Sequence, residues 1–148
     1  MATIREARPG EEERVLPMYE WLFAPPGYTP QWWDEDRARL ALTEAIVSPR
    51  SSVFVAEDGD TLVGFCTAYL ELNSVRFGQR CWVEDLATHP DHRSRGIGGA
   101  LLDAAGDWAR GAGATHLELD TGLDRADAQR FYDRREPAAK GYSYSWPL

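Results

Sequence analysis

The spacing of hydrophobic and polar positions predicts two helices in the first third of the chain. Between residues 15 and 22, apolar side chains recur at i, i+3, i+4 and i+7, which is the stripe of an amphipathic helix. Pro17 lies inside that stripe and should kink or shorten the helix. Residues 24–30 hold three prolines and one glycine, which is typical of a loop. Asp34 can cap a second helix, which stops at Ser48-Pro49.

Strand-like segments surround these helices. A first strand is expected over residues 3–8, and residues 52–57 and 61–72 flank Asp58-Gly59-Asp60, a strong hairpin turn. A further strand is expected over residues 80–88. This part of the chain therefore predicts antiparallel β structure.

Helix and strand patterns alternate in the last third. Apolar residues keep a helical period over residues 97–109, and Gly111 and Gly113 end that helix. Residues 115–121 alternate like a strand, and Asp124 can cap a last helix.

A closing strand is expected over residues 141–146, where aromatic side chains alternate with small ones. The predicted order is β-α-α-β-β-β-α-β-α-β. This order describes an α/β (α+β) fold with a mixed, mostly antiparallel sheet and helices on both faces. Because neither a repeat nor a linker interrupts the chain, we expect a single domain over residues 1–148.

Composition narrows the class of protein. The net charge of -8 disfavours a nucleic-acid partner, because phosphate binding needs a basic surface. No apolar run approaches the ~18 residues that would cross a membrane, and the first six residues are too polar for a signal peptide. We therefore expect a cytoplasmic protein with no membrane partner. Lys140 is the only lysine, a bias typical of a GC-rich bacterial genome.

The metal-binding residue types are too sparse to form a cluster. Cys66 and Cys81 lie in apolar strand-like segments and are expected to be reduced, buried thiols. The spacing of His89, His92 and His116 gives no ligand face, so no metal is expected.

The most informative segment is residues 82–102, in which a strand leads through a polar loop into a glycine-rich helix start. Free backbone N–H groups and the positive end of the helix dipole meet there, and glycine lets an anion approach the backbone. These features predict a diphosphate site. The glycines and the flanking basic residues are Gly96, Gly98, Gly99, Arg93 and Arg95.

Two other diphosphate loops fit less well. A Walker loop would need GxxxxGK[ST], which is absent. In a Rossmann loop, a third glycine would follow Gly96-x-Gly98, where Leu101 stands. Asp120 could imitate the ribose-binding acid, but the loop is too long and only one βαβ unit is present. A nicotinamide-binding oxidoreductase is therefore a distant alternative.

The segment Arg93-x-x-Gly96-x-Gly98 resembles the Q/R-x-x-G-x-G/A signature of the GNAT superfamily of acyl-CoA-dependent N-acetyltransferases. Ala128-x-x-Phe131-Tyr132 after the next strand also resembles this family. The resemblance implies a sheet of six to seven strands with about four helices, splayed between strands 4 and 5. It also implies acetyl-CoA as the co-substrate. Homodimers are common in the family, which leaves a homodimer open here.

The resemblance further assigns cofactor contacts to two segments. Pantetheine would run along the strand backbone, whose N–H groups can polarise the thioester oxygen, and the pyrophosphate would bind the loop. The residues implied along the pantetheine are Leu86, Ala87 and Thr88. The residues implied around the pyrophosphate are Arg93, Ser94, Arg95, Gly96, Ile97, Gly98 and Gly99.

The chain departs from the family pattern at two places. Arg125 stands where many members have asparagine, and Arg135-Glu136-Pro137 replaces a Gly-Phe pair. These departures keep a second hypothesis open, a non-catalytic acyl-CoA-binding or regulatory module on the same fold.

Three residues are candidates for proton transfer. Glu84 is the first candidate for the base that deprotonates the amine, directly or through water. Asp85 should point to the opposite face of the strand unless a bulge intervenes. Tyr132 resembles the family tyrosine that protonates the CoA thiolate; alternatively, it is a core contact paired with Phe131.

The acceptor is expected to be a small, primary amine. The aromatic loop at residues 23–33 can cover the acceptor site, anchor the core or contact a second copy. Acidic side chains near the expected cleft favour a cationic acceptor such as an aminoglycoside, a polyamine or an amino-acid-like amine. The candidate acceptor-binding residues are Tyr28, Trp32, Trp33 and Asp120, and the other acidic residues are Glu84, Asp85, Glu118 and Asp124.

Overall fold

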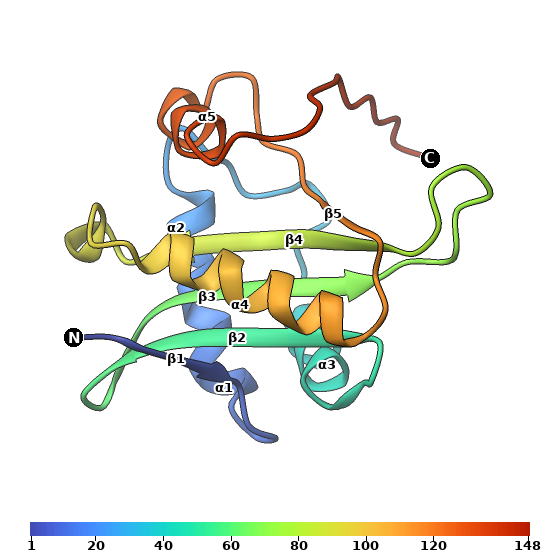
Figure 1. Ribbon diagram of the computed structural model, residues 1–148. Helices are drawn as coiled ribbons and strands as arrows, with labels where there is room; N and C mark the ends of the chain where they lie inside the picture. The colour runs from blue at the N-terminus through green and yellow to red at the C-terminus, as the bar shows by residue number, and fades with distance from the viewer. The chain divides into compact units, whose positions relative to one another are not determined.

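A computed structural model describes residues 1–148. Five strands form one sheet in the order of the chain (Figure 1). Neighbouring strands are antiparallel from β1 to β4, and β4 and β5 are parallel, so the sheet is mixed as expected. The strands are β1 (Thr3–Glu6), β2 (Ser51–Asp58), β3 (Thr61–Leu70), β4 (Arg80–Thr88) and β5 (His116–Glu118).

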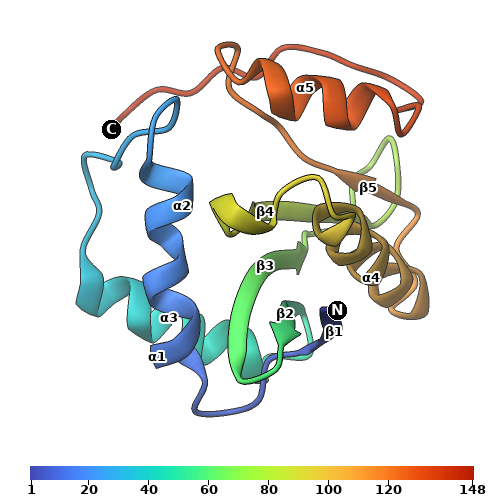
Figure 2. The same cartoon turned by 90° about the vertical axis from the view of Figure 1, so that its left-hand side faces the viewer.

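Helical segments cover both faces of this sheet (Figure 2). One face, called here the α3 face, is contacted by α1 (Glu12–Val15), α2 (Glu20–Phe23) and α3 (Glu35–Val47). The opposite face, the α4 face, is covered by α4 (Ile97–Gly111). The longer helices α3 and α4 bury apolar side chains against the strands, among them Leu42 and Ala45 of α3 and Leu101 and Ala105 of α4.

Local sequence explains where the helices break. The 3₁₀ turn η1 (Leu16–Tyr19) separates α1 from α2 and has Pro17 in its first turn. This agrees with the prediction that Pro17 interrupts the helix. Asp34 caps α3, since its Oδ1 accepts a hydrogen bond of 2.9 Å from the Arg37 backbone N–H. Gly113, with a φ of +88°, follows the end of α4.

The core is packed on both sides of β3. On the α3 face, fully buried Val15, Val55 and Phe65 belong to one apolar cluster. On the α4 face, a Cβ at Gly64 would lie 3.0 Å from Leu101 Cδ1 and 3.1 Å from an Ile97 methyl carbon. Because glycine leaves that space open, α4 can pack directly against the strand that neighbours β4.

The pairing of β4 with β5 is short. The ladder runs from Arg80↔His116 to Trp82↔Glu118, whereas β4 continues to Thr88. The strand predicted over residues 115–121 is therefore only three residues long. The GNAT resemblance implies that strands 4 and 5 splay apart, and β4 and β5 are the two strands whose pairing ends early.

Residues 119–148 form a second compact unit, distinct from the unit of residues 1–118. It contains one helix, α5 (Ala126–Asp133). The helix begins after Arg125 with no side-chain cap, so the prediction that Asp124 caps it was wrong.

The predicted closing strand is also absent, and the sheet has five strands rather than six to seven. Residues 141–148 form neither helix nor strand. The alternating Tyr142, Tyr144 and Trp146 are each at least three-quarters exposed, so neither face of the segment is buried. An alternating pattern makes a strand only when one face packs and a neighbour completes the ladder.

None of the helices has the length and apolar character required to cross a bilayer.

Candidate active site

A β-bulge in β4 brings two carboxylates to one face of the sheet. Thr67 of β3 is paired with Asp85, and the next residue of β3, Ala68, is paired with Val83. Glu84 is therefore the additional residue of the bulge. Without this bulge the side chains of Glu84 and Asp85 would point to opposite faces.

Hydrogen bonds show that both carboxylates lie on the α3 face. Asp85 Oδ2 accepts a hydrogen bond of 2.7 Å from the hydroxyl of Tyr19, which lies in η1. Glu84 Oε2 accepts one of 2.7 Å from Nε1 of Trp82, which is paired with Tyr69 on the same face as Asp85. We expected Asp85 to point away from Glu84 unless a bulge intervened, and the structure has that bulge.

The Asp85 carboxylate is tied to two hydroxyl groups. Its Oδ2 also accepts a hydrogen bond of 2.7 Å from Thr67 Oγ1, which in turn accepts one of 3.1 Å from the Asp85 backbone N–H. Burial raises the pKa of Asp85, although the hydrogen bonds from Thr67 and Tyr19 oppose that shift. Asp85 thus fixes the bulge and the η1 segment in place.

The two tyrosines beside this carboxylate are held as neutral hydroxyls. Burial, and then the charge of Asp85, keep the pKa of Tyr19 well above its usual range. Burial, and then the charges of Asp85 and Glu84, raise the pKa of Tyr69 to about 12. Both hydroxyls can therefore act as hydrogen-bond donors at neutral pH.

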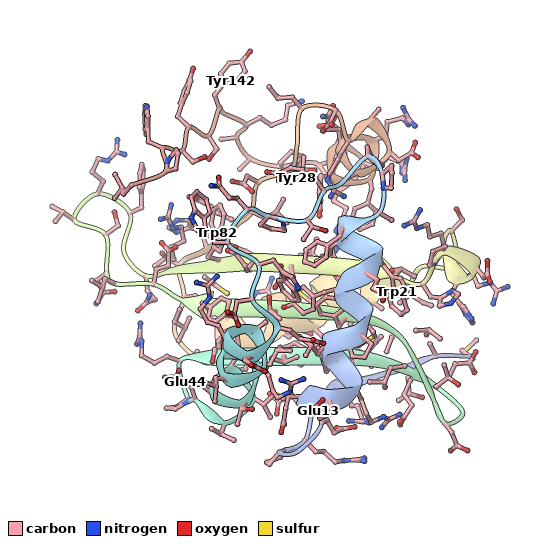
Figure 3. All side chains as sticks on the ribbon, turned by 180° about the vertical axis from the view of Figure 1, so that it is seen from behind. Glu13, Trp21, Tyr28, Glu44, Trp82 and Tyr142 are labelled. Carbon is pink, nitrogen blue, oxygen red and sulfur yellow. The ribbon has the colours of Figure 1, made fainter.

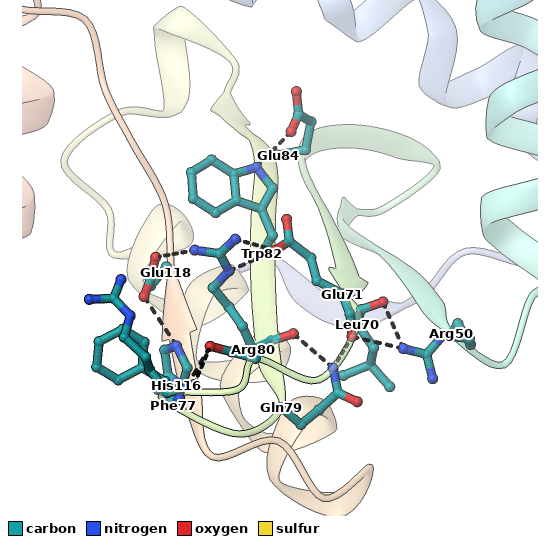
Figure 4. A network of polar contacts seen from close by, with 12 residues as sticks. Arg50, Leu70, Glu71, Phe77, Gln79, Arg80, Trp82, Glu84, His116 and Glu118 are labelled. Carbon is teal, nitrogen blue, oxygen red and sulfur yellow. Dashed lines mark hydrogen bonds and ion pairs between the residues drawn. The ribbon is translucent and has the colours of Figure 1, made fainter. Parts of the chain in front are cut away.

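Glu84 is exposed and lies just past the end of the β4–β5 ladder. The last ladder pair is Trp82↔Glu118, two residues before it. Figure 4 shows the side chains around this point, where Arg80 forms ion pairs with Glu71 and, at 2.9 Å, with Glu118. Glu84 is therefore presented to solvent beside a fixed network of charges.

The loop after β4 leads into a helix start without a side-chain cap. A short 3₁₀ turn, η2 (Pro90–His92), follows the strand. Ser94 and Gly96 have positive φ angles of +63° and +79°, and no side chain caps α4 at Gly96. The first helical hydrogen bond is donated by the Ala100 N–H, which leaves the earlier amides of the helix for another acceptor.

This backbone geometry suits an anion. Residues of alternating backbone hand form a concave nest of N–H groups, and the helix dipole adds positive potential. Arg93 and Arg95 are exposed at the same loop. The arrangement has the free N–H groups and positive charge that a diphosphate site needs, although binding itself stays a prediction. Leu86, Ala87 and Thr88 connect it to the bulge along β4.

The aromatic loop divides into an anchored part and an exposed part. Trp33 contacts the rings of Tyr19 and Phe23 at centroid distances of 5.8 and 4.8 Å, and it packs against the core of the α3 face. Tyr28 and Trp32 are 77% and 54% exposed. Figure 3 shows the α3 face with Tyr28 and Trp82 labelled. Trp33 thus anchors the loop, while the other two rings are available for contacts.

Two predicted site residues belong to the second unit. Tyr132 lies on α5, is half-buried and has an edge contact with Phe131 at a ring distance of 5.1 Å. Asp120 is exposed and lies beyond the last residue of β5. Their roles stay predictions.

The sequence pattern did not point to Tyr19, Thr67, Tyr69 or Trp82 as site residues. A signal was present for β3, because alternate residues of a strand share a face and both Thr67 and Tyr69 are polar positions on the face of Phe65. For Tyr19, the helical stripe indicated only a core position. The rings of His89 and His92 are in edge contact at 5.3 Å, and no group of three or more metal-binding side chains is found.

Comparison with known proteins places this sequence in a family. The sequence model of the acetyltransferase (GNAT) family matches residues 14–136. An uncharacterized N-acetyltransferase of Bacillus subtilis, YhdJ, is 37% identical over 110 residues, which cover 74% of this chain and 78% of the relative. An aminoglycoside N(6')-acetyltransferase type 1 of Stenotrophomonas maltophilia is 30% identical over 102 residues, 66% of each chain.

The fold of the chain is similar to that of a solved aminoglycoside acetyltransferase. The aminoglycoside N-acetyltransferase AAC(6')-Iy in complex with CoA superposes with a TM-score of 0.84 at 17% identity, covering 100% of this chain and 95% of that one. At this identity the likeness shows the fold alone. The family match over most of the sequence shows more: the chain belongs to the GNAT acetyltransferase family and is an acyl-CoA-dependent N-acetyltransferase.

Proposed function

We propose that this enzyme transfers an acetyl group from acetyl-CoA to a primary amine of a small, cationic acceptor by direct attack on the thioester. The observation that carries the proposal is the bulge of β4, which presents Glu84 where the ladder with β5 ends. The uncapped start of α4 lies at the other end of the same strand and loop. One continuous segment thus supplies both a candidate base and a candidate diphosphate site.

The loop residues fit the diphosphate of acetyl-CoA. The open amides of α4, the positive φ angles at Ser94 and Gly96, and the exposed Arg93 and Arg95 all favour an anion. We assign the pyrophosphate to residues 93–99 and the pantetheine to the backbone of residues 86–88. These amides can also stabilise the negative charge that develops on the thioester oxygen.

We assign the proton transfers to two residues. Glu84 accepts the proton of the acceptor ammonium, whose pKa is near ~10, so that the amine nitrogen can attack the thioester carbon. As the C–S bond breaks, the Tyr132 hydroxyl donates a proton to the departing thiolate. The newly acylated nitrogen still carries a second proton, which passes to the tyrosine oxygen, directly or through water, so that the amide and the neutral hydroxyl form together. Asp85 takes no proton in this scheme, because its carboxylate is engaged by Tyr19 and Thr67.

Charge and relatives support a cationic acceptor. Glu84 is exposed and the chain has a net charge of -8. Glu118 contributes less to this field than its sequence position implied, because it is paired with Arg80 and His116. A relative of 30% identity is an aminoglycoside acetyltransferase, and we propose an acceptor of that chemical class or a polyamine. Exposed Tyr28 and Trp32 would contact it, with Asp120 as a further contact.

The family match runs from the first compact unit into the second, which supports our proposal of one acetyltransferase domain over residues 1–148. A cytoplasmic location and a homodimer stay predictions from the sequence and the family resemblance.

A thiol-release assay tests the proposed reaction. The chain is mixed with acetyl-CoA and, in turn, kanamycin, spermidine and lysine, and the free thiol of CoA is followed. We expect release with at least one cationic amine, and a loss of about 100-fold or more in Glu84→Gln. Glu44→Gln, an exposed carboxylate on α3, is the matched control. CoA binding without thiol release from any amine would instead support the non-catalytic acyl-CoA-binding module.

A further inference from the structure

We propose that Trp82 is a positioning residue, whose indole N–H orients the Glu84 carboxylate toward the acceptor amine. The inference rests on the proposed role of Glu84 as the base. It concerns a residue to which neither the sequence pattern nor the family resemblance assigns a role.

The contact between the two side chains is direct. Trp82 Nε1 donates a hydrogen bond of 2.7 Å to Glu84 Oε2. The residues are two positions apart on β4, and the bulge at Glu84 turns its carboxylate toward the indole. An exposed glutamate on a strand has three rotatable bonds, so one fixed oxygen removes much of its conformational freedom.

The indole is itself held in place. The Arg80 guanidinium carbon lies 5.6 Å from the centre of the Trp82 ring, within the range of a cation–π contact. Arg80 is held in turn by carboxylates on two sides, Glu71 after β3 and Glu118 at the end of β5 (Figure 4). The indole therefore packs against a guanidinium that belongs to β4 and is paired with carboxylates of β5 and of the segment after β3.

This support is located where it is needed. Trp82 belongs to the last β4–β5 ladder pair, so its backbone is fixed from both sides, whereas Glu84 lies beyond the ladder. A general base acts only when its oxygen reaches the proton in the right direction. The hydrogen bond therefore links the Glu84 carboxylate, just beyond the β4–β5 ladder, to a residue whose backbone is paired with both β3 and β5.

Other charged groups around the pair must be distinguished from Glu84 in any pH experiment. Arg80, which is paired with Glu71 and Glu118, packs against the face of the indole ring. Asp85 with its partner Tyr19, and Tyr69 opposite Trp82, lie on the same face. A signal that responds to Glu84 must therefore be lost in Glu84→Gln.

The first test is spectroscopic and needs no acceptor. The indole N–H resonance of Trp82 is identified in the ¹⁵N-labelled full chain by its loss in Trp82→Phe. We expect it to move with pH in one acidic step in the wild type and in Glu44→Gln, and to lose that step in Glu84→Gln. A resonance that ignores pH, or that moves equally in Glu84→Gln, would overturn the contact.

The second test is kinetic. With acetyl-CoA and the most active of kanamycin, spermidine and lysine, we expect Trp82→Phe to lower kcat about tenfold with little change in the KM for acetyl-CoA. The acidic limb of its pH–rate profile should move to higher pH, because the ionised carboxylate loses a hydrogen bond. Trp108→Phe, on the opposite face of the sheet, is the control and should behave as wild type.

A double-mutant cycle separates positioning from a direct role. If Trp82 acts through Glu84, Trp82→Phe should have no further effect on kcat in the Glu84→Gln background. Equal losses in both backgrounds would refute the inference while leaving Glu84 as the base. Full activity of Glu84→Gln alone would instead refute the proposed role of Glu84, and the spectroscopic result would still report whether the contact exists.

Discussion

The Tyr19 hydroxyl donates a hydrogen bond of 2.7 Å to Asp85 Oδ2, joining two residues that are 66 positions apart. Tyr19 ends the 3₁₀ turn that leads into α2 and the aromatic loop, and Asp85 adjoins the bulge of β4. This bond ties the segment that leads into the predicted acceptor loop to the strand that carries the candidate base. The ring of Phe65 packs against the ring of Tyr19, with 4.8 Å between the two ring centres.

Removal of that hydroxyl should lower stability. In Tyr19→Phe, the buried Asp85 carboxylate keeps only the hydroxyl of Thr67 as a side-chain donor. We expect the free energy of unfolding to fall by about 2 kcal/mol, the usual cost of a lost hydrogen bond to a charged group. Urea denaturation measures it, with the largely exposed Tyr28→Phe as the control. A stability loss below that of the control would show that the bond contributes nothing.

The same carboxylate should make stability depend on pH. Burial raises the folded-state pKa of Asp85 above its unfolded value of about 3.9, so the folded state binds this proton more tightly. This contribution to stability is present below that value and is lost as pH rises through the folded pKa. Relative to Asp85→Asn, which has no such proton, the wild type should therefore lose stability from pH 4 to pH 7. Urea midpoints at both pH values test this, and a relative gain by the wild type would contradict it.

Glu11 should show the opposite pH dependence. Its carboxylate accepts hydrogen bonds from Arg5, Arg14 and the backbone of Arg8 at 2.7–3.0 Å, and the Arg5 contacts above all lower its pKa to about 2. Its stabilisation is full above the unfolded pKa of about 4.3 and is lost as pH falls toward 2. We expect Glu11→Gln to cost about 2 kcal/mol at pH 7 and much less near pH 2. A cost independent of pH would exclude this ionic origin.

Elements governed by local rules could be predicted from the sequence. The strand β4 has the bounds expected for it, residues 80–88. The helix α4 begins at Ile97, where its helical period begins, and it ends at Gly111, one of the two glycines expected to end it. The cap at Asp34 and the break at Pro17 follow from the chemistry of single residues.

Features set by distant partners could not be predicted. The aromatic alternation of residues 141–146 resembles a strand, but no neighbouring strand pairs with it. The bulge at Glu84 depends on its register with Thr67, and the bond from Tyr19 depends on the docking of η1. The two carboxylates were therefore named from the sequence, whereas the bulge that brings them to one face and the partners that hold Asp85 required the fold.

The proposed acid can be tested apart from cofactor binding. Tyr132→Phe keeps the ring that contacts Phe131 but removes the hydroxyl. We expect kcat to fall about tenfold while the affinity for acetyl-CoA changes little, since the thiol pKa of about 8.5 makes the acid helpful rather than essential. Thiol-release kinetics and a CoA titration measure the two quantities separately. Unchanged turnover would remove Tyr132 from the mechanism.

The diphosphate site predicts a charge-specific loss of cofactor binding. Acetyl-CoA at about 100 times its Kd should raise the Tm of the wild type by about 5 °C. Gly98→Glu would place a carboxylate in the first turn of α4, where the helix dipole favours it, so the variant should fold. The same negative charge would repel the diphosphate and abolish the shift. Gly106→Glu is the matched control, since it lies on the same helix with open space at its Cβ and should keep the shift. If Gly98→Glu retained the full shift, the amides at the start of α4 would not be the cofactor site, and residues 93–99 would lose their assigned role.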